Sequence, residues 1–368
     1  MTDAAAAPTQ GERLACAPDT GFVEWLAACG GTIAVSTYQA GKLLLIGWNG
    51  RQPSLLPRHF DKPMGFDVLG DRMVLSTRNH ITLFANDTVL AHHYQHDKPG
   101  RYDALYLPRL SYHTADLNTH DVALSEDDVW ILNTRFSCLC GLSDRWTFVP
   151  RWRPGFITDL VPEDRCHLNG LAMVDGQPGY VTCLGETDTV GGWRDVKVGG
   201  GVVVDVQRNE VILRGLAMPH SPRWHDGRLW VLNSGEGRLL RVNPADGQAD
   251  VVCELPGYLR GLAFVGSYAL VGLCKIRETN VFGGMPVQAR YPELQCAVSV
   301  VDTRSGREVG RFSITAGCTE IYDIRFLKGQ HKVNVLNLDR EEARQAFNAP
   351  PDVHYWLRPE NEIKDGAG

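Results

Sequence analysis

The stretch NTHDVALSEDDVWIL at residues 118–132 decides the fold, because its pattern returns five more times along the chain. Each copy is a short alternating run, a turn rich in Gly, Asp or Ser, and a second apolar run, which is typical of a β-hairpin. The other copies read KPMGFDVLGDRMVL (62–75), HLNGLAMVDGQPGYV (167–181), MPHSPRWHDGRLWVL (218–232), YLRGLAFVGSYALVG (258–272) and EIYDIRFLKGQHKVNVL (320–336).

Further strand-like runs lie between these hairpins, so each repeating unit holds about four strands. The units begin roughly 40 to 60 residues apart, which is the spacing of propeller blades and longer than most helical repeats. The sequence therefore predicts an all-β protein, a six-bladed β-propeller.

The two ends of the chain are expected to share one blade. The segment TIAVSTYQAGKLLLIGWN (32–49) resembles the middle strands of a blade that lacks its inner strand, and the repeat at 320–336 supplies an unmatched inner strand. Joining them closes the ring and removes exposed sheet edges. Whether the run that begins at Lys332 displaces a strand of this blade stays open. We expect helices near Phe22 and Arg340.

These patterns divide the chain into a disordered segment at 1–20, a single propeller domain at 21–358 and a loose tail at 359–368. A net charge of -6 without a basic stripe argues against nucleic acid. We find no membrane span and no export signal, and the ten cysteines are scattered singly, so we expect a cytoplasmic protein with reduced thiols.

Residues at one aligned position of the six inner strands must form a ring around the channel. Two such rings follow from the alignment, and together they contain imidazoles, amides, cations, phenols and a carboxylate. The first ring comprises Met64, His120, Asn169, His220, Arg260 and Tyr322. Two residues earlier, on the same face of an extended strand, come Lys62, Asn118, His167, Met218, Tyr258 and Glu320.

The ring residues suggest a site for a small anionic substrate. Neutral imidazole is a common ligand for zinc, iron and copper, so His120, His167 and His220 are the candidate ligands of a divalent ion. Arg260 is the candidate anion clamp, unless it pairs with Glu320 or Asp323. The remaining candidates are Asn169, Asn118 and Lys62 for substrate binding, and Tyr322, Tyr258 and Glu320 for proton transfer.

A long insertion, GETDTVGGWRDVKVGGG (185–201), carries Trp193 and either covers the channel or forms a surface hairpin. The histidines at positions 92, 93 and 96 are interpreted as part of a solvated loop, in preference to a metal site.

Several of these motifs resemble a bacterial family of six-bladed propellers that is labelled only as of unknown function. They are STYQAGKLLLIG (36–47), NTHDVAL (118–124), HLNGLAM (167–173), LRGLAF (259–264) and EIYDIRFL (320–327). The resemblance covers about residues 22–338 and implies the fold, the blade count and no activity.

Two more distant resemblances concern the channel. NGLAM is similar to the Asn-Gly motif of the gluconolactonase and senescence-marker propellers, which implies that Asn169 helps to bind a divalent ion. However, His120 and His220 occupy the places of the acidic partners, which argues against calcium. The histidine-rich ring is similar in composition to that of the peptidyl-hydroxyglycine lyase propellers, which bind zinc through histidines from separate blades and use an Arg and a Tyr.

Two functions remain open at this point. The first is a metal-assisted hydrolase or lyase that acts on a small anionic substrate in the channel. The second is a non-catalytic propeller that binds a protein partner or a small ligand at the channel mouth.

Overall fold

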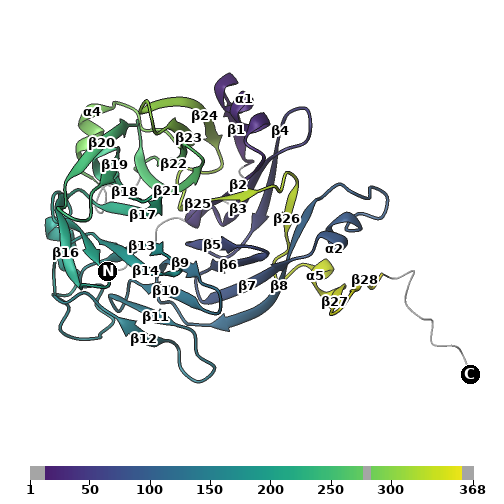
Figure 1. The fold of residues 1–368 in the computed structure, drawn as a ribbon, viewed down its shortest axis with the longest axis horizontal. Coiled ribbons are helices and arrows are strands. Elements are labelled where there is room, and N and C mark those ends of the chain that lie inside the picture. Colours follow the sequence, from purple (N-terminus) through teal and green to yellow (C-terminus); the bar gives the residue numbers. More distant parts are fainter. Residues whose placement is uncertain (1–12, 277–282, 359–368) are drawn as a thin grey trace, which may run out of the picture.

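The computed structural model describes residues 13–276 and 283–358, and within these ranges six sheets of four or five strands are present. Figure 1 shows the sheets arranged around a central axis. This arrangement is the predicted six-bladed β-propeller. In five of these blades a hairpin turn joins the strand nearest the axis to the next strand of the same sheet.

The closing blade joins the two ends of the chain, as predicted. Strand β25 (Asp323–Lys328) lies innermost and pairs antiparallel with β2 (Gly31–Ser36), with Ser36 opposite Asp323. The blade continues outward through β3 (Lys42–Trp48) and β4 (Pro53–His59). Every residue of β2 is buried, because this strand is central in its sheet and covered on both faces.

Each of the other five blades is built from four consecutive strands. One contains β5 (Phe66–Leu69), β6 (Arg72–Ser76), β7 (His80–Asn86) and β8 (Ala104–His113). The next contains β9 (Thr119–Leu124), β10 (Val129–Asn133), β11 (Cys138–Gly141) and β12 (Val149–Trp152).

The third of these blades contains β13 (Leu168–Val174), β14 (Gln177–Cys183), β15 (Gly201–Asp205) and β16 (Glu210–Leu216). It is followed by β17 (Pro219–His225), β18 (Arg228–Asn233), β19 (Arg238–Val242) and β20 (Ala249–Glu254). The last contains β21 (Tyr258–Val265), β22 (Tyr268–Cys274), β23 (Ala297–Asp302) and β24 (Arg307–Ala316).

Two blades gain a fifth strand at the outer edge. Strand β26 (Val333–Val335) pairs parallel with β8, so the run that begins at Lys332 displaces no strand of the closing blade. Strand β1 (Ala15–Pro18) pairs with β24. The prediction of disorder is therefore wrong for residues 15–18, which cover an otherwise open strand edge. Residues 1–12 and the predicted tail at 359–368 lie outside the described residues.

Helix α1 (Thr20–Ala28) confirms the helix predicted near Phe22. The Asp19 side chain caps it by accepting a hydrogen bond from the Phe22 N–H group at 2.7 Å. Phe22, Trp25 and Leu26 are buried in a core cluster that includes residues of β2, β3, β23 and β24, so α1 seals the joint between the closing blade and the last blade.

A small appendage lies beside β8, outside the six sheets. Strands β27 (Ala346–Ala349) and β28 (Val353–Trp356) form a hairpin next to α2 (Thr88–His92). Helix α5 (Glu341–Arg344) is shorter than the helix predicted near Arg340, because Ala346 already begins β27. The other helices in the described residues are α4 (Pro286–Arg290) and the 3-10 turns η1 (Tyr38–Ala40), η2 (Gly192–Val196) and η3 (Ser234–Glu236).

Glycines let neighbouring inner strands approach each other closely. A Cβ atom on Gly65 would lie 2.6 Å from Cα of Asp121 on the next blade, and one on Gly170 would lie 2.3 Å from Pro222. Backbone contact between blades therefore accounts for the Gly in the NGLAM motif. No helix in the described ranges is long and apolar enough to cross a membrane.

Candidate functional site

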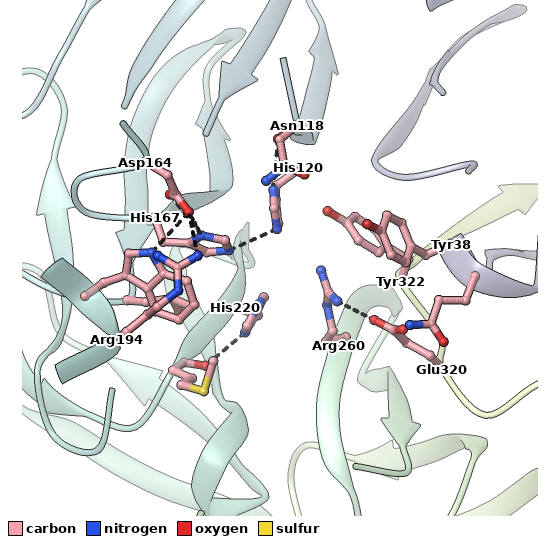
Figure 2. A pocket seen from close by; sticks show the side chains of 14 residues that line it. Tyr38, Asn118, His120, Asp164, His167, Arg194, His220, Arg260, Glu320 and Tyr322 are labelled. Atoms are coloured by element: carbon pink, nitrogen blue, oxygen red, sulfur yellow. Dashed lines mark hydrogen bonds and ion pairs between the residues drawn. The ribbon is translucent and has the colours of Figure 1, made fainter. Parts of the chain in front are cut away.

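A pocket of about 270 Å³ lies at the end of the channel where the inner strands begin. Figure 2 shows its side chains converging from several blades and from loops between them. The residues that line it are Tyr38, Gln39, Asn118, His120, Asp164, His167, Leu184, Trp193, Arg194, Met218, His220, Arg260, Glu320 and Tyr322.

His120 and His220 are oriented by the same local hydrogen-bond arrangement. Asn118 and Met218 have left-handed backbone conformations, with φ of 53° and 50°. The Nδ1 atom of His120 lies 3.0 Å from the Asn118 carbonyl oxygen, and that of His220 lies 2.9 Å from the Met218 carbonyl oxygen. Because a carbonyl oxygen only accepts, each Nδ1 carries the hydrogen, and Nε2 of each neutral ring is an acceptor.

His167 is oriented by Asp164, whose two carboxylate oxygens each lie 3.0 Å from Nδ1. Trp193 donates from its indole nitrogen to the same carboxylate at 3.1 Å, and its ring lies 4.4 Å from the imidazole. Trp193 is only 2% exposed. The insertion at 185–201 therefore covers one side of the pocket, and Arg194 from the same loop stacks on Trp193.

The closest contact in the pocket joins two imidazoles from neighbouring blades. Nε2 of His120 and Nε2 of His167 are 3.2 Å apart, as the dashed line in Figure 2 shows. Since both Nδ1 atoms already donate elsewhere, two neutral rings would direct two lone pairs at each other. A proton or a metal ion between the nitrogens would make this contact favourable.

Arg260 lies on the opposite side of the pocket. Its Nη1 donates to Glu320 at 2.6 Å, and its guanidinium carbon lies 3.9 Å from the centre of the Tyr322 ring. Tyr38 stacks on Tyr322 with the ring centres 5.4 Å apart. Within the described structure, the Arg260 Nε atom and the Tyr322 hydroxyl are buried and have no hydrogen-bond partner, so two polar groups beside the pocket are left unsatisfied.

Burial sets the protonation states of the pocket. It lowers the pKa of His120 and His220 well below the ordinary value, and the Arg260 charge acts in the same direction. Burial also raises the pKa of Tyr322 well above that of a free phenol, although Arg260 opposes this shift. At neutral pH the pocket therefore contains two neutral imidazoles and a protonated phenol.

An ionic cluster on the inner strands closes the channel below the pocket. Arg223 donates to Asp121 and to Asp323, each at 3.0 Å. Arg325 contacts Asp323 at 2.8 Å and Asp67 at 3.0 Å. The side chains of Asp121 and Asp323 are each 5% exposed, so these charges are shielded from water and pair with each other across four blades.

A family model matches residues 20–336, which is most of the chain. The chain belongs to the family described as "Domain of unknown function (DUF4915)". No curated protein matches.

A solved structure supports the fold of this DUF4915 domain. A chain of a nidogen/laminin complex matches 82% of this chain and 100% of its own length, with 13% identity and a TM-score of 0.52. A catalytically inactive virginiamycin B lyase from Staphylococcus aureus, crystallised with quinupristin, matches 82% of this chain and 99% of its own, with 9% identity and a TM-score of 0.42. At such identities the likeness concerns the fold alone.

The DUF4915 domain brings together most of the residues that the aligned rings single out. Those that line the pocket are Asn118, His120, His167, Met218, His220, Arg260, Glu320 and Tyr322. The pairing of Arg260 with Glu320 is the alternative that the sequence left open, whereas Asp323 belongs to the ionic cluster.

Three predicted site residues do not line the pocket. Asn169 is buried between blades, where it donates to the Pro219 carbonyl oxygen and accepts from Thr182, so its amide is already satisfied. The Lys62 ammonium lies over the aromatic ring of Tyr38. Tyr258 lies behind His220, with its hydroxyl 3.4 Å from Nδ1.

The three-histidine metal centre stays a prediction. Throughout residues 13–276 and 283–358, no group of three or more His, Cys, Asp or Glu side chains is arranged to hold a metal ion. Of the three predicted ligands, His120 and His167 have their Nε2 atoms 3.2 Å apart.

Sequence reasoning missed Asp164, Tyr38 and Arg194, which come from loops and not from inner strands. For Asp164 a signal existed, because an acidic residue three positions before a histidine at the start of an inner strand is well placed to orient the ring.

Proposed function

We propose that the protein is an enzyme of the hydrolase or lyase class that acts on a small carboxylate substrate in this pocket, assisted by a divalent metal ion. The observation that carries the proposal is the 3.2 Å separation of the His120 and His167 Nε2 atoms, with both Nδ1 atoms committed to acceptors. A buried, unsatisfied anion clamp beside them supplies the substrate site.

The geometry of the two nitrogens suits shared ligation. Zinc binds imidazole nitrogen at about 2.0 to 2.1 Å, which places two tetrahedral ligands about 3.3 Å apart. Asp164 holds His167 as a carboxylate does in many metal sites, and the Asn118 carbonyl plays this part for His120. With two protein ligands, water or substrate would complete the coordination. A bound ion would polarise a substrate oxygen or activate water.

The other side chains have separable roles. Arg260 pairs with Glu320 through Nη1 and would bind a carboxylate through Nη2. The Tyr322 phenol retains its proton at neutral pH and would donate a hydrogen bond to a developing negative charge. Trp193 covers His167 and excludes water from that side of the pocket.

A non-catalytic ligand-binding propeller is the second candidate. It is favoured by the same short contact if a proton, and not a metal ion, lies between the two imidazoles. His167 would then donate from Nε2 to His120, with Asp164 balancing the positive charge.

Metal content separates the two candidates. The protein is purified without added metal, incubated with zinc, dialysed, and its zinc content per chain is measured for wild type, His120→Gln and His167→Gln. The matched control is His96→Gln, an exposed histidine outside the pocket. We expect near-stoichiometric zinc in wild type and control and its loss in both pocket variants. Folded wild-type protein that retains no zinc would contradict the metal-assisted enzyme.

A further inference from the structure

We propose that the substrate is a 2-hydroxy carboxylic acid, whose carboxylate binds Arg260 and whose hydroxyl donates to Nε2 of His220. The inference rests on the proposed function only in taking this pocket as the substrate site. It deepens that proposal by assigning the substrate class from the donors and acceptors that the pocket leaves unpaired.

The first observation is the unpaired Nη2 nitrogen of Arg260. The guanidinium bonds Glu320 through Nη1, and its face is occupied by the Tyr322 ring. Within the described structure Nε is buried without a partner, whereas Nη2 is not among the buried nitrogens, so Nη2 is the one that can meet a ligand in the pocket. A charged guanidinium N–H group is a strong donor to a carboxylate oxygen.

The second observation is that His220 offers only an acceptor. Its Nδ1–H group donates to the Met218 carbonyl oxygen at 2.9 Å, with the Ser234 hydroxyl 3.1 Å away. Burial and the Arg260 charge lower its pKa, so Nε2 stays unprotonated. His220 lines the pocket while being only 4% exposed. A ligand that fills this space must therefore supply a donor, or leave a buried acceptor unsatisfied.

The two groups lie beside each other. Figure 2 shows the Arg260 guanidinium between Glu320 on one side and His220 on the other, and Arg260 is close enough to shift the His220 pKa. A carboxylate on Arg260 therefore has its neighbouring carbon near His220, and a hydroxyl on that carbon meets the acceptor. A neutral hydroxyl suits this place better than an ammonium group, because the Arg260 cation repels positive charge.

The pocket volume and walls guide the choice of probe. About 270 Å³ holds a molecule of mandelate size, and Tyr38, Tyr322 and Trp193 provide aromatic walls. The closest matched probes are mandelate, phenylacetate, which lacks the hydroxyl, and phenylglycine, which carries an ammonium group in its place.

Calorimetric titration of metal-stripped, EDTA-treated protein tests the inference, because chelation of a metal ion by the hydroxy acid cannot then produce the preference. We expect mandelate to bind about tenfold more tightly than phenylacetate, the effect of satisfying one buried acceptor. In His220→Asn, which keeps a donor toward the Met218 carbonyl but withdraws the acceptor from the pocket, the preference should fall to about twofold or less. Arg260→Lys should weaken both acids equally.

Equal binding of the two acids to wild type would overturn the inference, as would a preference that survives in His220→Asn or tighter binding of phenylglycine. Binding of neither acid in the millimolar range would also overturn it. The outcome is distinct from that of the zinc experiment: protein that retains no zinc and still prefers mandelate refutes the metal-assisted enzyme and supports the hydroxy-acid site.

Discussion

The buried histidines predict that the protein loses stability as the pH falls below 6.5. Burial and the nearby Arg260 charge hold the pKa of His220 well below the ordinary value of 6.5. In the unfolded chain the imidazole takes up a proton below that pH, whereas in the folded chain it does not. The stabilisation is therefore fully present above pH 6.5 and is lost as the pH falls toward the lowered pKa.

The magnitude follows from proton linkage. Each histidine that stays neutral in the folded state lowers the free energy of unfolding by up to about 1.4 kcal/mol for each pH unit below 6.5. Burial also lowers the pKa of His120, which is partly open to the pocket. A change of this size per pH unit is measurable against the free energy of about 5 to 15 kcal/mol that is typical of folded proteins.

Urea unfolding of wild type and of His220→Asn, measured between about pH 7.5 and about pH 5, isolates this effect. The variant is expected to be less stable at every pH, but its free energy of unfolding should fall less steeply, by the contribution of one proton. His96→Asn, at an exposed position, should retain the wild-type slope. The same slope in wild type and His220→Asn would refute the interpretation of His220 as a neutral buried imidazole.

Three further outcomes follow from contacts elsewhere. Arg223→Met should lower the free energy of unfolding in urea by about 3 to 5 kcal/mol, because Asp121 and Asp323 stay buried with one partner fewer. The control Arg228→Met, at an exposed position, should lower it by less than about 0.5 kcal/mol. A loss of less than about 1 kcal/mol in Arg223→Met would contradict the role of the cluster. Gly65→Ala should destabilise by about 1 to 3 kcal/mol, since its Cβ would meet the Asp121 backbone. In the same assay Gly176→Ala should show a smaller loss, because the new Cβ would meet no atom within 4 Å and only the positive φ of 77° at this position causes strain. Burial raises the pKa of Asp87, but hydrogen bonds from the Leu90 N–H, Asn348 and His354 outweigh it and the pKa is lowered overall. The stabilisation is thus present above about pH 3.8 and lost as the pH falls through the lowered value. Because Asp87 bonds Asn348 and His354 of the terminal hairpin, we expect faster hydrogen exchange in β27 and β28 of Asp87→Asn and unchanged exchange in β2. Exchange in β27 and β28 equal to that of wild type would show that Asp87 does not hold the hairpin in place.

The sequence by itself determined the fold. A hairpin pattern that recurs six times reports the local alternation of apolar residues, and this alternation is what forms the blades. It also determined the closure, because the N-terminal segment lacked an inner strand and the C-terminal segment had one to spare. The first ring placed His120, His220, Arg260 and Tyr322 correctly, since residues at one aligned position of rotated blades meet at the axis.

Only the tertiary structure decided which polar residues share the pocket and how they are paired. Left-handed conformations at Lys62, Asn118 and His167 interrupt the strand alternation on which the second ring relied, so each of these side chains takes its own direction. Asn169 donates to the Pro219 carbonyl oxygen of the neighbouring blade and accepts from Thr182 of its own blade, so its amide turns away from the pocket. Asp164 and Trp193 reach His167 from loops, and contacts of this kind depend on the packing of distant segments, which no local periodicity records.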